Sequence, residues 1–214
     1  RRSGNQFALC LALAFITEHH ARLGDAKGAM AGLAEAEQLA REPLNRVLLA
    51  MVLMVKGNLA MCEERFHDAI VAYKECIDLH NSTRVFGPIG WAQNGMAYAY
   101  MRVGEPERAR QVFGESLETG RICGNRAMAL SNWVGFAALA AEAGDLHRAA
   151  RLMGAADSMR RKTRYVPWTS NQGPFALAQR TVLEKLPPEE LAAERSKGER
   201  LPPEEVSAMA LGNK

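Results

Sequence analysis

The sequence predicts an all-α fold, built as an array of antiparallel helix pairs. A pattern recurs at a spacing of about 40 residues, in which a turn precedes a helix that carries a small residue. The repeated small residues are Ala29, Ala69, Ala109 and Ala149. Aromatic residues make up only 7% of the chain, whereas Ala, Leu, Glu and Arg are abundant, and this composition favours helix. The 48% hydrophobic content is ample for a core.

Four repeats of two helices each are expected, at about residues 5–41, 46–81, 88–121 and 126–164. One helical face of the first repeat carries Leu13, Ile16, Thr17 and His20. Gly24-Asp25 should end that helix, because glycine adopts the left-handed conformation at no steric cost. The second repeat has Glu64 where the other turns have glycine, so its turn departs from the pattern.

The repeated alanines are expected to serve close packing. Alanine at a helix crossing lets two helices approach to within about 8–10 Å. Larger residues four positions later fill the space beside it: Leu33, Tyr73, Phe113 and Met153. A bulky residue at Ala69 or Ala109 should therefore overpack the crossing and cost about 1–3 kcal/mol.

The repeat stops after about Arg164, and residues 165–214 are expected to form C-terminal capping helices. The composition of residues 165–174 predicts a loop, with Pro174 in the first turn of a helix that reaches about Lys185. Pro-Pro-Glu-Glu occurs twice, at 187–190 and 202–205, and predicts two further helix starts, since acidic residues there favour the helix dipole. Gly212 should end the last helix.

Charge and motifs exclude several classes of function. The net charge of +3 is too small to predict direct nucleic-acid binding. No apolar run approaches the ~20 residues of a membrane span, so we expect no membrane contact and a cytoplasmic protein. The four cysteines and five histidines lack metal-ligand spacing, so the thiols are expected to be small buried hydrophobes, with no metal and no cofactor. The chain begins Arg1-Arg2-Ser3, which indicates a piece of a longer polypeptide.

The turn, the alanine, the large residue after it and the next small residue together resemble the tetratricopeptide repeat. The resemblance implies a right-handed superhelical array, an α-solenoid. The period here is longer than the usual ~34 residues of that family, and the proline that closes each repeat is absent. The additional residues are expected to lengthen the second helices and the connections at about 41–46, 81–88 and 121–126.

The tail carries a second resemblance. The run from Arg148 to Asp157, the run from Gly198 to Leu201 and the segment from Glu204 to Leu211 resemble the C-terminal end of bacterial multidomain regulators. In those proteins a STAND-type ATPase precedes the repeats and a LuxR-type helix-turn-helix often follows. Other members carry a nucleotide cyclase or a Ser/Thr kinase domain. None of that chemistry lies in this chain, which has no GxxxxGK[ST] phosphate loop and no catalytic signature, so we expect no enzyme activity.

The first helices of tetratricopeptide repeats line a concave groove. Carried over position by position, the groove residues expected here are Met51, Met54, Asn58, Met61, Trp91, Asn94, Tyr98 and Met101. Methionine surfaces repack around varied partners, and aromatic residues beside amides can anchor a peptide or a small effector. The alternative is that these residues pack against a neighbouring domain, the tail or a second copy of the chain.

These observations favour a non-catalytic interaction and sensor module of a bacterial signalling protein, in particular a transcriptional regulator. A protein, peptide or small effector would bind in the groove and act on an attached ATPase or output domain. Two alternatives remain. One is an assembly scaffold that forms homodimers, and the other is the regulatory repeat region of a cyclase or kinase.

Overall fold

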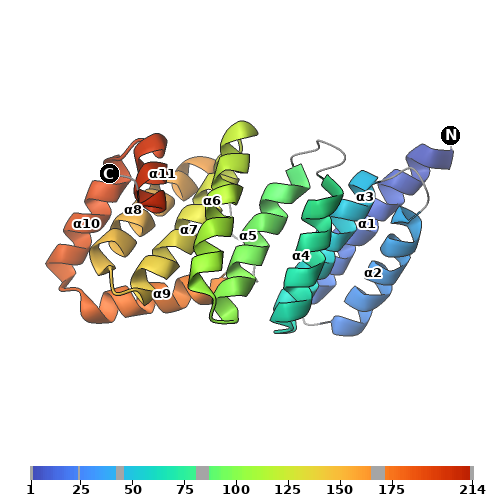
Figure 1. Cartoon of the computed structure of the whole chain (residues 1–214), viewed down its shortest axis with the longest axis horizontal. Coiled ribbons are helices and arrows are strands. Elements are labelled where there is room, and N and C mark those ends of the chain that lie inside the picture. The colour runs from blue at the N-terminus through green and yellow to red at the C-terminus, as the bar shows by residue number, and fades with distance from the viewer. Residues whose placement is uncertain (1, 24, 42–45, 81–86, 165–171, 213–214) are drawn as a thin grey trace. The chain divides into compact units, whose positions relative to one another are not determined.

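The computed structural model describes residues 2–23, 25–41, 46–80, 87–164 and 172–212 (Figure 1). Every regular element in these ranges is an α-helix and none is a strand, which confirms the predicted all-α class. The chain divides into two compact units, Arg1–Val103 and Gly104–Lys214. This division falls inside the third predicted repeat, between its two helices.

The first unit contains five helices in the described residues. They are α1 (Arg2–Arg22), α2 (Ala26–Ala40), α3 (Arg46–Cys62), α4 (Phe66–His80) and α5 (Gly87–Arg102). Helix α1 packs on α2 and α3 packs on α4, so each of the first two predicted repeat ranges holds one packed helix pair. Helix α3 also contacts α1, α2 and α5 and lies at the centre of the unit.

Small residues lie where these helices approach most closely. Ala29 and Ala69 have no exposed surface, as the repeat pattern predicts. The ring of Tyr73 lies against Gly57 of α3 and Gly95 of α5, and a Cβ on either glycine would come closer than 3.0 Å to the ring. A large aromatic residue is therefore accommodated because two neighbouring helices present no side chain at the point of contact.

Helix α1 turns only part of the predicted face inward, since Thr17 is buried and Leu13 packs on the core but Ile16 does not. Ile16 is 48% exposed, whereas Cys10, Ala14 and Thr17 are buried. A Cβ on Gly32 of α2 would come closer than 3.0 Å to Oγ1 of Thr17, so α1 and α2 approach through small residues. The prediction for Ile16 was wrong because close approach of the two helices selected the small-residue face over the bulkier one.

Three turns between described helices share one hydrogen-bonding pattern. After α3, the amide of Glu64 donates to the carbonyl of Met61 and that of Arg65 donates to the carbonyl of Ala60, which is a Schellman motif. The same two bonds recur around Gly144 and also around Gly124, in a connection where no repeat turn was predicted. Gly124 and Gly144 have positive φ, and Glu64 adopts φ 58° in the same role. The second repeat thus keeps the turn geometry although it lacks the glycine.

The second unit contains six helices in the described residues. They are α6 (Pro106–Ile122), α7 (Arg126–Glu142), α8 (Leu146–Thr163), α9 (Gln172–Lys185), α10 (Pro188–Arg200) and α11 (Pro203–Leu211). All residues of α7 from 130 to 141 are buried, because α6, α8, α9 and α11 surround it. Figure 1 shows α9 running crosswise to α7 and α8, and its buried Ala178 and Val182 lie one helical turn apart.

The tail helices begin and end at the predicted signals. Helices α10 and α11 start at Pro188 and Pro203, and Gly212 ends α11 in the left-handed conformation. Helix α9 starts at Gln172, two residues before Pro174. The rest of the predicted loop, 165–171, lies outside the described residues, as do Gly24 and most of the connections at 41–46 and 81–88.

Helices α8 and α10 cross with their backbones almost in contact. A Cβ on Gly154 would come closer than 3.0 Å to the carbonyl of Arg195, and one on Gly198 would approach the carbonyl of Arg151 equally closely. These glycines belong to the two runs that carry the tail resemblance. Ion pairs flank the crossing, and they advance in the same direction along both helices, so α8 and α10 run parallel. They include Arg151–Glu194 and Arg161–Glu199, and Nε2 of His147 lies 3.7 Å from a carboxylate oxygen of Glu190 in the same order.

The cysteine prediction holds at two positions and fails at two. Cys10 and Cys76 are buried, and burial raises the pKa of the Cys76 thiol to about 12. Cys62 and Cys123 are exposed because they lie where α3 and α6 end, at the helix termini and outside the packed faces. Among the described helices, none is both long and apolar enough to cross a membrane.

Candidate binding surface of the first unit

The predicted groove residues of α3 lie on one stripe of the helix but differ in exposure. Met51, Met54 and Asn58 are half-buried, whereas Met61 is only 5% exposed. The hydroxyl of Tyr73 donates a hydrogen bond of 2.7 Å to Oδ1 of Asn58. The Asn58 carboxamide therefore supports the Tyr73 contact inside the unit, and the two methionines remain as the accessible part of the stripe.

The predicted groove residues of α5 are mostly buried. Asn94 and Tyr98 have no exposed surface and Met101 is 9% exposed, while Trp91 is half-buried. Helix α5 packs on both α3 and α4, so its residues from 92 to 99 are all buried. In this structure Met61, Asn94, Tyr98 and Met101 are packing residues, and a ligand at this surface would meet Met51, Met54 and Trp91.

These three accessible residues come from adjacent helices. Met51 and Trp91 occupy the same position in successive repeats, and α3 contacts α5. The thioethers of Met51 and Met54 and the indole of Trp91 are soft, polarisable apolar groups, which fit differently shaped apolar partners. Behind them, the Tyr73 ring between two glycines gives a close-packed support.

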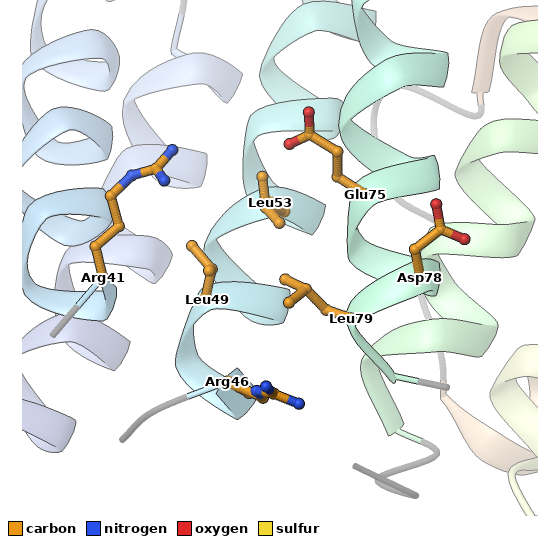
Figure 2. Close-up of a pocket in the computed structure, with 7 residues that line it drawn as sticks. All are labelled: Arg41, Arg46, Leu49, Leu53, Glu75, Asp78 and Leu79. Atoms are coloured by element: carbon orange, nitrogen blue, oxygen red, sulfur yellow. The ribbon is translucent and has the colours of Figure 1, made fainter. Parts of the chain in front are cut away.

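The first unit also has a hollow that sequence reasoning missed. A pocket of about 500 Å³ lies among α2, α3 and α4, with Leu49, Leu53 and Leu79 in its lining (Figure 2). Figure 2 shows Arg41 on the α2 side and Glu75 and Asp78 on the α4 side of the leucines. Since α3 has about 3.6 residues per turn, Leu49 and Leu53 lie nearly opposite the methionine stripe.

The charges around this pocket are largely uncompensated. Arg41 pairs with Glu37. By contrast, Arg46, Glu75 and Asp78 make no ion pair or side-chain hydrogen bond with another described residue. The paired spacing of Leu49 with Leu53 and of Glu75 with Asp78 is the sequence signal that could have indicated a shared face. Chemically, the pocket offers an apolar floor between charges of opposite sign.

Two histidines, His20 and His147, lie beside carboxylates. Nδ1 of His20 is 2.8 Å from Oδ2 of Asp25. The other carboxylate oxygen, Oδ1, caps α2 by accepting a hydrogen bond from the amide of Gly28. That amide bond, together with the His20 contact, holds the pKa of Asp25 below its ordinary value. Within the described residues no group of three or more His, Cys, Asp or Glu side chains is arranged to hold a metal ion.

Comparison with known proteins found no matching family model, no matching curated protein and no matching solved structure. The resemblance to tetratricopeptide repeats and to bacterial regulators therefore rests on the motifs of the sequence.

Proposed function

We propose that this chain is a non-catalytic interaction and sensor module of a bacterial cytoplasmic signalling protein, in particular a transcriptional regulator. The proposal includes a tetratricopeptide-like, right-handed superhelical arrangement of the helix pairs. It is supported by the repeated small-residue crossings and by the resemblance of the tail to LuxR-type and STAND-type regulators.

The observation that carries the proposal is the accessible surface of Met51, Met54 and Trp91. Apolar residues of this kind at the centre of a surface supply most of the binding energy in many protein interfaces. The surface belongs to α3 and α5, which pack on each other and on α4, so a ligand there contacts more than one helix pair.

Binding at this surface would act on the rest of the protein by a population shift. A ligand that touches both α3 and α5 binds more tightly to the arrangement of helix pairs that fits it. Only this differential affinity can change the balance between two states of an attached ATPase or output domain. A tenfold difference in affinity between the states shifts their ratio tenfold, which corresponds to about 1.4 kcal/mol.

Methyl NMR of the methionines tests the proposal at the site itself. The chain is labelled with ¹³C-methyl methionine and titrated with a panel of metabolites and short apolar peptides. We expect saturable shifts of the Met51 and Met54 methyl resonances, assigned through Met51→Leu and Met54→Leu. Met30, which is 59% exposed on α2, is the matched control and should not shift.

Two further variants separate binding from folding. Trp91→Ala removes accessible apolar surface and should weaken any ligand found by about tenfold or more. Met30→Ala should leave its affinity unchanged. A panel that shifts no resonance of Met51 or Met54, or that shifts Met30 equally, would contradict the proposed site.

A second candidate function, homo-oligomeric assembly, is favoured by the exposed face of α1. Phe15 is 60% exposed, Leu9 and Ile16 are also exposed on this helix, and Leu23 is exposed directly after its end. Exposed apolar residues gathered on one helix are a common feature of protein interfaces. Sedimentation velocity across a concentration series would reveal dimers, and Phe15→Glu should abolish them. A monomer at all concentrations would exclude this function.

A further inference from the structure

The second unit contains a cavity that the interaction surface does not use. It has a volume of about 570 Å³ and lies among α6, α7 and α11, with Met159 of α8 also in its lining. Leu117, Trp133 and Met159 form an apolar floor, since each is buried. Ala208 and Leu211 of α11 also line the cavity. This volume is within the range of about 300–1,000 Å³ that is typical of small-molecule sites.

The polar groups at the floor and one part of the rim already have partners. Nε1 of Trp133 donates to the hydroxyl of Ser207 at 3.2 Å, and that hydroxyl donates to the carbonyl of Pro203. Arg121 binds Glu118 through two hydrogen bonds of 2.7 and 2.6 Å. These groups are therefore occupied, and they leave the floor without an unsatisfied polar atom.

Arg126 differs from its neighbour Arg121. It lines the same cavity but makes no ion pair or hydrogen bond through its side chain with another described residue. It is also the first residue of α7, where the helix dipole disfavours a cation. A bound anion would therefore interact favourably with both the guanidinium and the helix end. The nearby Glu118 and Glu204 also line the cavity, and they would repel a doubly charged phosphate more than a single carboxylate.

We propose that this cavity binds a small amphipathic monocarboxylic acid. The apolar body of the ligand lies on Leu117, Trp133 and Met159, and its carboxylate pairs with Arg126 at the rim. Guanidinium and carboxylate form two parallel hydrogen bonds, which fixes the orientation of the acid in the cavity. The site is independent of the methionine surface and of the function proposed for it.

Such a ligand would also stabilise the last helix. Side chains hold α11 to the rest of the unit through the Trp133–Ser207 hydrogen bond and through Arg148, whose Nη2 donates to the carbonyl of Ala210 at 2.7 Å. A ligand in contact with Ala208 and Leu211 binds only while α11 is docked. By mass action, binding then reduces the population in which α11 is detached.

Calorimetric titration of the full chain with sodium decanoate tests the site. We expect saturable binding of one decanoate, with affinity rising roughly fourfold for each added methylene from octanoate to dodecanoate. Arg126→Gln should weaken decanoate binding by about tenfold or more, because a hydrogen bond to a charged group is lost. Arg180→Gln, which removes an exposed arginine of α9 outside the cavity, is the matched control and should have no effect.

A second variant tests the apolar part without changing charge. Ala208→Phe fills the cavity and should abolish decanoate binding, with unfolding followed separately by circular dichroism. Decanol should bind the unmodified chain about as weakly as decanoate binds Arg126→Gln. Three results would each overturn the proposal. They are the absence of saturable binding, an equal loss of affinity in Arg126→Gln and Arg180→Gln, and an unchanged affinity in a folded Ala208→Phe variant.

Discussion

Replacement of Gly198 by alanine should weaken the docking of α10 on α8. The new Cβ would come closer than 3.0 Å to the carbonyl oxygen of Arg151, and this neighbour is backbone, which cannot rotate away as a side chain would. The two helices must therefore separate. A gap of about 1 Å forfeits up to half of the dispersion energy between the atoms that line the crossing.

The magnitude follows from three contributions. Overpacking in a close-packed interior costs about 1–3 kcal/mol, and a backbone neighbour places this site at the upper end. Alanine recovers about 1 kcal/mol through its higher helix propensity. Separation also loosens the pair between Arg151 and the buried Glu194, which adds to the cost. We expect a net loss of about 2–3 kcal/mol in the free energy of unfolding of the second unit.

Urea denaturation and native-state hydrogen exchange measure this loss globally and at α10. Gly114→Ala is the matched control, since its Cβ would lie 3.3 Å from the flexible end of Leu211 and should leave stability unchanged or raise it. Amides of α10 should exchange faster in Gly198→Ala and at the original rate in Gly114→Ala. If Gly198→Ala were as stable as the unmodified chain and kept the protection of α10, the close crossing would be refuted.

Three other changes should have measurable effects on stability. Glu64→Gly should raise the free energy of unfolding by about 0.5–1 kcal/mol in urea denaturation, because glycine adopts positive φ without strain. Thr17→Val should raise the melting temperature, since the buried Thr17 hydroxyl has no hydrogen-bond partner among the described residues. Hydrogen bonds from Arg151 and Lys197 lower the pKa of Glu194 from 4.5 to about 2. The free energy of unfolding should therefore fall as the pH is lowered from 4.5 to about 2 in an acid titration. In Glu194→Gln most of this pH-dependent fall should be absent.

The sequence allowed the local features of the fold to be predicted, because they depend on short-range patterns. The buried alanines, the Pro-Pro-Glu helix starts and the stop at Gly212 each follow from a few adjacent residues and their conformational preferences. The turn at Glu64, which departs from the pattern in sequence, keeps the geometry of the glycine turns, since the hydrogen bonds of the Schellman motif involve only backbone atoms.

Features that depend on contacts between distant segments were missed. The residues expected in the groove on α5 lie on one helical stripe, but periodicity does not indicate which stripe a neighbouring helix covers, and Tyr98 is fully buried. The crossing of Gly154 and Gly198 joins two helices separated by α9. The cavity of the second unit combines residues from Gly114 to Leu211, and no spacing in the sequence relates them.

The most direct test of the proposed function is the fluorescence of Trp91 in a chain that carries Trp133→Phe and Trp168→Phe. Metabolites and short peptides are titrated in, and the affinity of any ligand is measured again in Met54→Ala and in the control Met30→Ala. The proposal predicts a saturable change in Trp91 emission that is weakened at least tenfold by Met54→Ala and unaffected by Met30→Ala. A panel that leaves Trp91 emission unchanged, or a ligand that binds equally well to Met54→Ala, would contradict the assignment of this surface as the binding site.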